Sequence, residues 1–97
     1  MNKSDLEQIA LAIEKGAGQD LLDIRQALSE AADATYSKEQ IIVRAARKRL
    51  EMSQAMFANL IDTPVGTLRG WEQGRFEVPG AVITLMKVAI KNPDSLR

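Results

Sequence analysis

Apolar residues recur three and four positions apart along most of this chain, which predicts helices and no strand. The first third carries two such stripes, at Leu6, Ile9, Ala10 and Ile13 and then at Leu21, Ile24, Ala27 and Leu28. Ser4, in a capping box with Glu7, and Asp20 can cap these two helices, and Gly16 can end the first. We therefore expect two amphipathic helices within residues 1–36.

Two further helices are predicted in the rest of the chain, apart from the central segment treated below. Ser37 and Gln40 form a second capping box, which predicts a helix from Lys38 to Leu50 with Ile41 and Ala45 on its inner face. A last helix is expected at about 81–91, after a Pro-Gly pair and before an Asn-Pro pair. One side of this last helix is lined by Val82, Leu85, Met86 and Ala89.

The central segment, SQAMFANLIDTPVGTLRGWEQG from Ser53 to Gly74, predicts two short helices joined by a tight turn. Ser53 can cap the first helix, Thr63 can cap the second with Pro64 at its first position, and Gly74 can end it in a left-handed conformation. The residues that the first helix should bury are Phe57, Leu60 and Ile61. Two short helices that cross steeply are the layout of a helix-turn-helix DNA reader.

The outward side of the second helix is the expected DNA-binding surface. With Leu68 and Trp71 turned inward, Arg69 can bond guanine, and the two glycines would let the backbone approach the DNA. Thr67 can bond a base or a phosphate, Val65 can meet a thymine methyl group, and Gln54 can bond a phosphate. The full set of expected DNA contacts is Gln54, Thr63, Pro64, Val65, Gly66, Thr67, Arg69, Gly70 and Arg75, with Arg44 and Lys48 neutralising further phosphates.

Any small helical bundle contains short helices joined by polar turns, so the pattern alone leaves a purely structural interpretation open. The segment resembles the Xre-type, lambda-repressor-like helix-turn-helix family, in which Ser-Gln opens the first helix and Trp-Glu-x-Gly closes the second. The resemblance implies an all-α fold with a five-helix core, here at 37–97, behind an N-terminal helical extension at 1–36. It also implies that Arg47 pairs with Glu72 and fixes the recognition helix.

A narrower resemblance rests on TPVGTLRGWEQGR, followed by a proline and by an aliphatic helix that closes at Asn-Pro. Over about residues 38 to 93 the chain is similar to HigA-type antitoxins. This implies a repressor of its own operon that also neutralises a RelE-like, ribosome-dependent toxin that cleaves messenger RNA. The alternative is a plain Xre-type regulator without a toxin partner, and a short basic toxin gene beside this one would separate the two.

The overall net charge of zero conceals an asymmetry between the two ends of the chain. Residues 1–40 contain four Lys or Arg against eight Asp or Glu, a net charge of −4, and residues 41–97 contain nine against five, a net charge of +4. The basic part can bind phosphates, whereas DNA would repel the acidic part. We therefore expect the region 1–36 to contact a basic toxin or to serve dimerisation; solvated helix faces are the plainer interpretation.

The last helix carries more apolar surface than a small core needs, because Ile83, Val88 and Ile90 fall off its inner side. A two-fold homodimer would cover this excess and place two recognition helices about 34 Å apart, over an inverted-repeat operator. The residues expected in the dimer interface are Val82, Ile83, Met86, Val88 and Ile90.

The composition argues against catalysis. The chain has no Cys and no His, so it lacks thiolate metal ligands and the usual general base, and it contains no Gly-rich phosphate loop. We expect no cofactor, no metal and no enzymatic activity. The sequence also has no apolar run of about 18 residues and no signal peptide, so we expect a cytoplasmic protein without membrane contact.

The chain departs from the family at the start of its second helix. Xre-type readers commonly carry polar side chains at the first outward positions, where this chain has Pro64, Val65 and Gly66. Sequence specificity should therefore rest on Arg69, Thr67 and the shape of the DNA.

Overall fold

The computed structural model describes residues 3–14, 21–33 and 35–96 of the 97-residue chain. These residues form α-helices, one short 3-10 helix and no strand, which confirms the predicted all-α fold. The elements are α1 (Lys3–Glu14), α2 (Leu21–Ala31), α3 (Lys38–Arg49), α4 (Gln54–Leu60), α5 (Val65–Gln73), α6 (Gly80–Lys91) and the 3-10 helix η1 (Pro93–Ser95). The core expected at 37–97 thus consists of α3 to α6 and η1.

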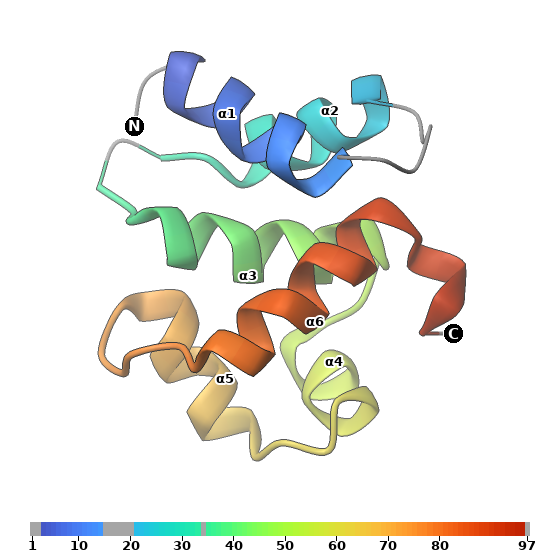
Figure 1. Ribbon diagram of the computed structural model, residues 1–97. Helices are drawn as coiled ribbons and strands as arrows, with labels where there is room; N and C mark the ends of the chain where they lie inside the picture. Colours follow the sequence, from blue (N-terminus) through green and yellow to red (C-terminus); the bar gives the residue numbers. More distant parts are fainter. Residues whose placement is uncertain (1–2, 15–20, 34, 97) are drawn as a thin grey trace.

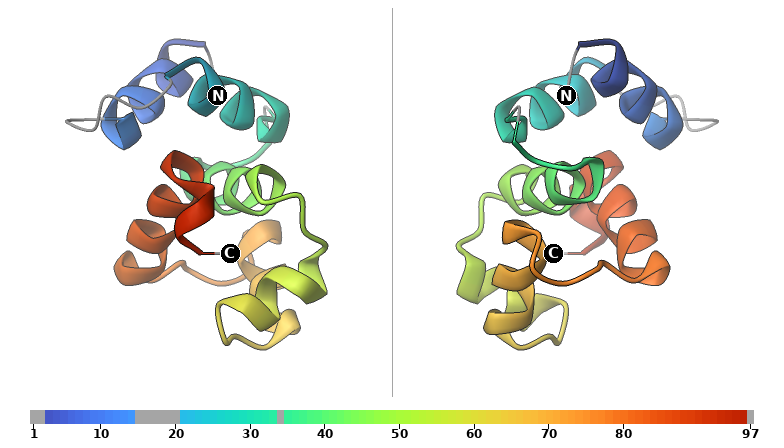
Figure 2. Two further views of the ribbon diagram at one scale, coloured as in Figure 1. Left: turned by 90° about the vertical axis from the view of Figure 1, so that its right-hand side faces the viewer. Right: turned by 90° about the vertical axis from the view of Figure 1, so that its left-hand side faces the viewer.

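Helix α3 runs through the middle of the molecule, with α1 and α2 above it and α4 and α5 below it in Figure 1. The side views in Figure 2 show the same layering, with α6 packed beside α3. α3 contacts α2, α5 and α6, and α1 lies against α2 and α6. α2 therefore packs on the same helix, α3, that supports α5.

α3 is buried over more of its circumference than the sequence predicts. Its capping box is present: the Ser37 hydroxyl accepts the Gln40 N–H, and the Gln40 side-chain oxygen accepts the Ser37 N–H. The buried residues of α3 are Ile41, Ile42, Val43, Ala45 and Ala46, of which the sequence pattern predicts only the first and the fourth. The reason is that helices cover α3 on two sides, whereas the pattern assumes one buried face.

Most predicted helix ends agree with the structure. Ser53 caps α4 by accepting the Met56 N–H at 3.1 Å, and Gly74 ends α5 with a φ of +76°. α1 runs from Lys3, so Ser4 lies in its first turn, and the Ser4 side chain, the predicted cap, is outside the described part of the structure. The predicted cap at Asp20 and the stop at Gly16 lie outside the described residues.

α6 corrects the predicted dimer interface. Met86 and Ile90 are both 0% exposed and belong to the core of the protomer. Val82 and Ile83 are half-buried, and Val88 is 42% exposed. The prediction fails for Met86 and Ile90 because α6 packs against α3, α1 and α2, so the chain's own N-terminal helices cover part of the surface that the sequence analysis assigned to a second copy.

Candidate nucleic-acid interface

Helices α4 and α5 form a helix-turn-helix unit whose turn contains no glycine. Asp62 adopts a φ of +55°, a left-handed conformation that aspartate tolerates better than most residues. The turn satisfies carbonyl groups at the end of α4, because the N–H of Asp62 donates to Asn59 and that of Thr63 donates to Ala58 at 2.9 Å. The chain thereby reverses within a few residues and carries α5 across α4.

The start of α5 differs from the prediction. Pro64 occupies the N-cap position and α5 begins at Val65, with no side-chain cap. The Thr63 hydroxyl points back along the chain and donates to the Ile61 carbonyl at 3.2 Å, so its predicted capping role is wrong. The Pro64 carbonyl instead accepts the N–H groups of Thr67 and Leu68, which closes the first turn.

The inner side of α5 is packed against α3 and α4. Leu68 is 0% and Trp71 6% exposed, as expected for residues that face the core. From α4, Phe57 and Ala58 complete this contact. Leu60 is 37% exposed, so its predicted burial is wrong; the small Ala58 takes the inner position where α5 approaches.

The outer side of α5 is accessible over its first two turns. Arg69 and Gly66 are exposed, and Val65 and Thr67 are half-buried. A Cβ atom built on Gly66 would have nothing within 4 Å, so this part of the helix faces open space. Arg75, just beyond the helix, is exposed as well.

Gly70 is buried, unlike the outward position that the sequence analysis expects. The ring of Phe76 covers it, and a Cβ atom on Gly70 would lie 2.1 Å from the ring Cδ2. The N–H groups of Arg75 and Phe76 both donate to the Gly70 carbonyl, and these bonds bring the chain back over α5. Phe76 itself is 53% exposed, and sequence reasoning missed it; the left-handed Gly74 before it was the available signal.

A buried ion pair joins α5 to α3. Glu72 is 0% exposed, and its carboxylate accepts from Arg47 twice, Nε to Oε2 at 2.8 Å and Nη2 to Oε1 at 3.0 Å. Arg47 also donates from Nη1 to the Met52 carbonyl, in the link between α3 and α4. This two-bond geometry fixes the rotation of α5 relative to its scaffold.

Arg44 and Lys48 make intramolecular contacts in place of the open positions that phosphate binding would need. Arg44 donates from Nε and Nη2 to the Glu72 carbonyl oxygen at 2.9 and 2.6 Å, and its guanidinium lies 4.1 Å from the centroid of the Tyr36 ring. Lys48 donates from Nζ to the Glu30 carbonyl at 3.2 Å, at the end of α2. These side chains connect α3 to α5 and to α2, respectively.

Gln54 lies between the ion pair and the outer surface. Its Nε2 donates to Oε1 of Glu72 at 3.3 Å, and its Oε1 accepts from Nε of Arg69 at 3.2 Å. The side chain is half-buried. Both ends of the amide are thus engaged within the protein.

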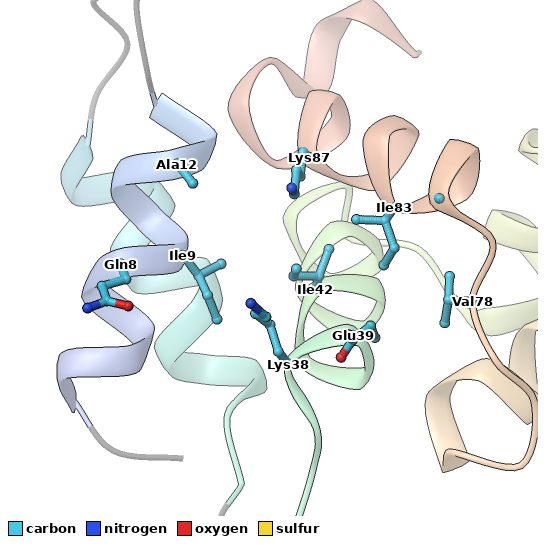
Figure 3. A pocket seen from close by; sticks show the side chains of 10 residues that line it. Gln8, Ile9, Ala12, Lys38, Glu39, Ile42, Val78, Ile83 and Lys87 are labelled. Carbon is cyan, nitrogen blue, oxygen red and sulfur yellow. The ribbon is translucent and has the colours of Figure 1, made fainter.

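A separate cavity of about 620 Å³ lies between α1, α3 and α6 (Figure 3). Ile9, Ile42 and Ile83 supply apolar walls, and Lys38 and Lys87 line it as well. No residue of α4 or α5 borders this cavity, which separates it from the helix-turn-helix surface.

The described residues offer no metal site and no membrane span. They contain no group of three or more acidic side chains placed to bind an ion. None of the helices in this part has the length and apolar character that crossing a bilayer requires.

Comparison with known proteins finds a relative among the antitoxins. Antitoxin HigA-2 of Vibrio cholerae serotype O1 is 32% identical to this chain over 69 residues, which are 71% of the chain and 64% of that protein. The chain thus spans slightly less than two thirds of the relative's length. No protein-family model matches the chain, and no solved structure gives a significant match. The chain is therefore similar to antitoxin HigA-2, and this likeness supports the resemblance to HigA-type antitoxins that its sequence pattern predicts.

Proposed function

We propose that this protein is a non-catalytic antitoxin that represses its own operon and binds a RelE-like toxin. The proposed DNA binding is supported by the accessible outer side of α5. This side presents exposed Arg69 on a helix that the Arg47–Glu72 pair holds against α3. The likeness to antitoxin HigA-2 supports the toxin-binding half. An operon repressor acts in the cytoplasm, where the toxin would meet its ribosomal target.

In this proposal α5 enters the major groove of an operator. Arg69 bonds guanine through its guanidinium, and the first two turns of the helix lie along the base edges. The residues proposed to touch DNA are those of the expected set that remain accessible, Thr63, Pro64, Val65, Gly66, Thr67, Arg69 and Arg75. Gly70 leaves the set because Phe76 covers it, and Gln54, Arg44 and Lys48 leave it because their polar groups bond within the chain.

The repressor would act as a homodimer on an inverted repeat, since two recognition helices spaced about 34 Å apart read successive turns of one DNA face. Of the predicted interface residues, Val82, Ile83 and Val88 keep accessible surface and remain in the proposal.

Binding of the full-length protein to its own upstream promoter tests the DNA-binding half. Anisotropy at two salt concentrations, with unrelated DNA as the reference, separates site-selective from general phosphate binding. The proposal expects promoter-selective binding that Arg69→Ala weakens by about 1 to 3 kcal/mol with the fold intact. Equal affinity for both DNAs, or unchanged affinity in the variant, would remove Arg69 as the reader.

The N-terminal extension is the proposed toxin contact. Exposed carboxylates at Glu30 and Asp33 lie at the end of α2, and a basic ribonuclease would be attracted to them. Co-purification with the product of a short basic gene beside this one would support the contact. Glu30→Lys should weaken that complex, and Glu77→Lys, on the loop after α5, is the matched control.

A plain repressor with a small-molecule effector is the second candidate. The cavity between α1, α3 and α6 favours it, because its volume of about 620 Å³ is that of a typical small-ligand site and it joins the extension to the DNA-binding part. The absence of a toxin gene beside this one, together with promoter binding, would favour this candidate over the antitoxin.

A further inference from the structure

Four side chains form a continuous chain of hydrogen bonds from the scaffold to the outer surface of α5. Arg47 of α3 donates to Glu72 of α5, Gln54 of α4 donates to the same carboxylate, and Arg69 of α5 donates to Gln54. This hydrogen-bond network leads from the fully buried carboxylate of Glu72 to the exposed side chain of Arg69. Gln54 is the link between the two.

The orientation of the Gln54 amide is fixed from both sides. A carboxylate paired with arginine can only accept hydrogen bonds, so Glu72 requires the NH₂ group of Gln54 on its side. A guanidinium can only donate, so Arg69 requires the carbonyl oxygen of Gln54 on the other side. Reversing the amide would set oxygen against oxygen and N–H against N–H, so only one of the two amide orientations satisfies all partners.

This arrangement leaves the two terminal nitrogens of the Arg69 guanidinium available to bind a base. The guanidinium has five N–H donors in a rigid fork, and only Nε is used by Gln54. The pair of terminal nitrogens can therefore bond O6 and N7 of a guanine together. A guanidinium already held by its Nε loses less side-chain entropy when it binds than one that moves freely.

We propose that Gln54 is a positioning residue that acts on DNA recognition through Arg69, with Glu72 dictating which way its amide faces. This deepens the proposed function and rests on it, since Arg69 is the proposed base reader. It also separates Gln54 from the phosphate contact expected from the sequence. A phosphate contact strengthens binding to every DNA alike, whereas positioning strengthens discrimination at the base pair that Arg69 reads.

The first test needs no DNA. Nitrogen-proton NMR of the free full-length protein should show an Arg69 Nε–H that exchanges with water more slowly than that of exposed Arg75. Gln54→Ala and Gln54→Met, the second of which keeps most of the side-chain volume, should both abolish this protection. Gln26→Ala, on exposed α2, is the matched control and should leave it unchanged. Equal exchange at Arg69 in the wild type and in both Gln54 variants would overturn the proposal.

The second test is a double-mutant cycle on promoter DNA. Gln54→Met should lower promoter affinity about 5- to 10-fold, the size of one ordinary hydrogen bond, and should have no further effect in an Arg69→Ala background. Additive losses would show that Gln54 acts on its own, as a phosphate ligand does, and would overturn the positioning role. A wild-type protein that lacks promoter selectivity would instead overturn the proposed function, and the exchange measurement would still decide whether Gln54 holds Arg69.

Discussion

Phe76 lies so close over Gly70 that a Cβ atom on the glycine would stand 2.1 Å from Cδ2 of the ring. Gly66, one turn earlier in the same helix, has nothing within 4 Å of an added Cβ atom. Both glycines weaken α5 through backbone entropy, but only one of them leaves room for a side chain. Substitution by alanine should therefore change the free energy of unfolding in opposite directions at the two positions.

Gly66→Ala should raise the free energy of unfolding by up to about 1 kcal/mol, because alanine is the better helix former and meets no neighbour. Gly70→Ala should lower it by about 1 to 2 kcal/mol, because the ring of Phe76 has to move away. Urea denaturation measures both changes. In a Phe76→Ala background the penalty at Gly70 should disappear, and a penalty that persists there would contradict the proposed clash.

Glu72→Gln should destabilise the protein by about 3 kcal/mol, because it leaves the Arg47 guanidinium without a charged partner in a largely buried position. Thermal unfolding followed by circular dichroism measures this loss. Glu77→Gln removes an exposed carboxylate a few residues later and should change stability by less than about 0.5 kcal/mol. Similar effects of the two substitutions would mean that the ion pair adds nothing specific to the scaffold.

The Asp33 carboxylate accepts hydrogen bonds in the segment between α2 and α3. The N–H and hydroxyl of Thr35 donate to its carboxylate at 2.9 and 2.7 Å, and these bonds lower the pKa of Asp33 below its ordinary value of 3.8. A pKa that is lower in the folded state adds stability above the unfolded value and loses it as the pH falls through the folded value.

Asp33→Asn should therefore be less stable than the wild type at pH 7, and the difference should shrink once the pH falls well below 3.8. Urea midpoints at neutral and acidic pH test this, and NMR titration of the Asp33 carboxyl group gives its pKa directly. A stability difference that does not change with pH would rule out the charge as its cause.

Variants of Ile90 and Val88 distinguish burial in the protomer core from burial in a dimer interface on α6. Ile90→Ala should cost about 2 to 4 kcal/mol, because the side chain is 0% exposed, whereas Val88→Ala should cost less than about 0.5 kcal/mol in the protomer. Unfolding measured over a range of protein concentrations tests this. If the loss of stability in Ile90→Ala grows with protein concentration, Ile90 lies in an interface between subunits.

Local chemistry made much of the fold predictable from the sequence. The capping hydroxyls of Ser37 and Ser53 and the left-handed Gly74 act within a few residues of the chain, so their positions specify helix ends directly. The inward Leu68 and Trp71 follow from helical spacing in the same way. The sequence resemblance to HigA-type antitoxins rests in part on TPVGTLRGWEQGR, which lies in this segment.

The failures at Gly70 and Ile90 have a different cause, since each depends on tertiary packing. Gly70 is covered by Phe76, which returns over the helix, and Ile90 is buried on α6, which packs against α3, α1 and α2. Helical periodicity indicates that a residue can be buried but does not identify which neighbour buries it.

Because α2 packs on α3 and α1 packs on α6, loss of the two N-terminal helices should lower the stability of the rest of the chain. Digestion of the extension by a protease would uncover apolar side chains such as Ile42 and would remove the Lys48 bond to α2. The remaining helices would then hold α5 with less buried surface and would unfold, and be degraded, more readily. If the protein represses its operon as proposed, proteolysis that begins in the N-terminal extension would in this way also end repression, without any cut in the helix-turn-helix unit itself.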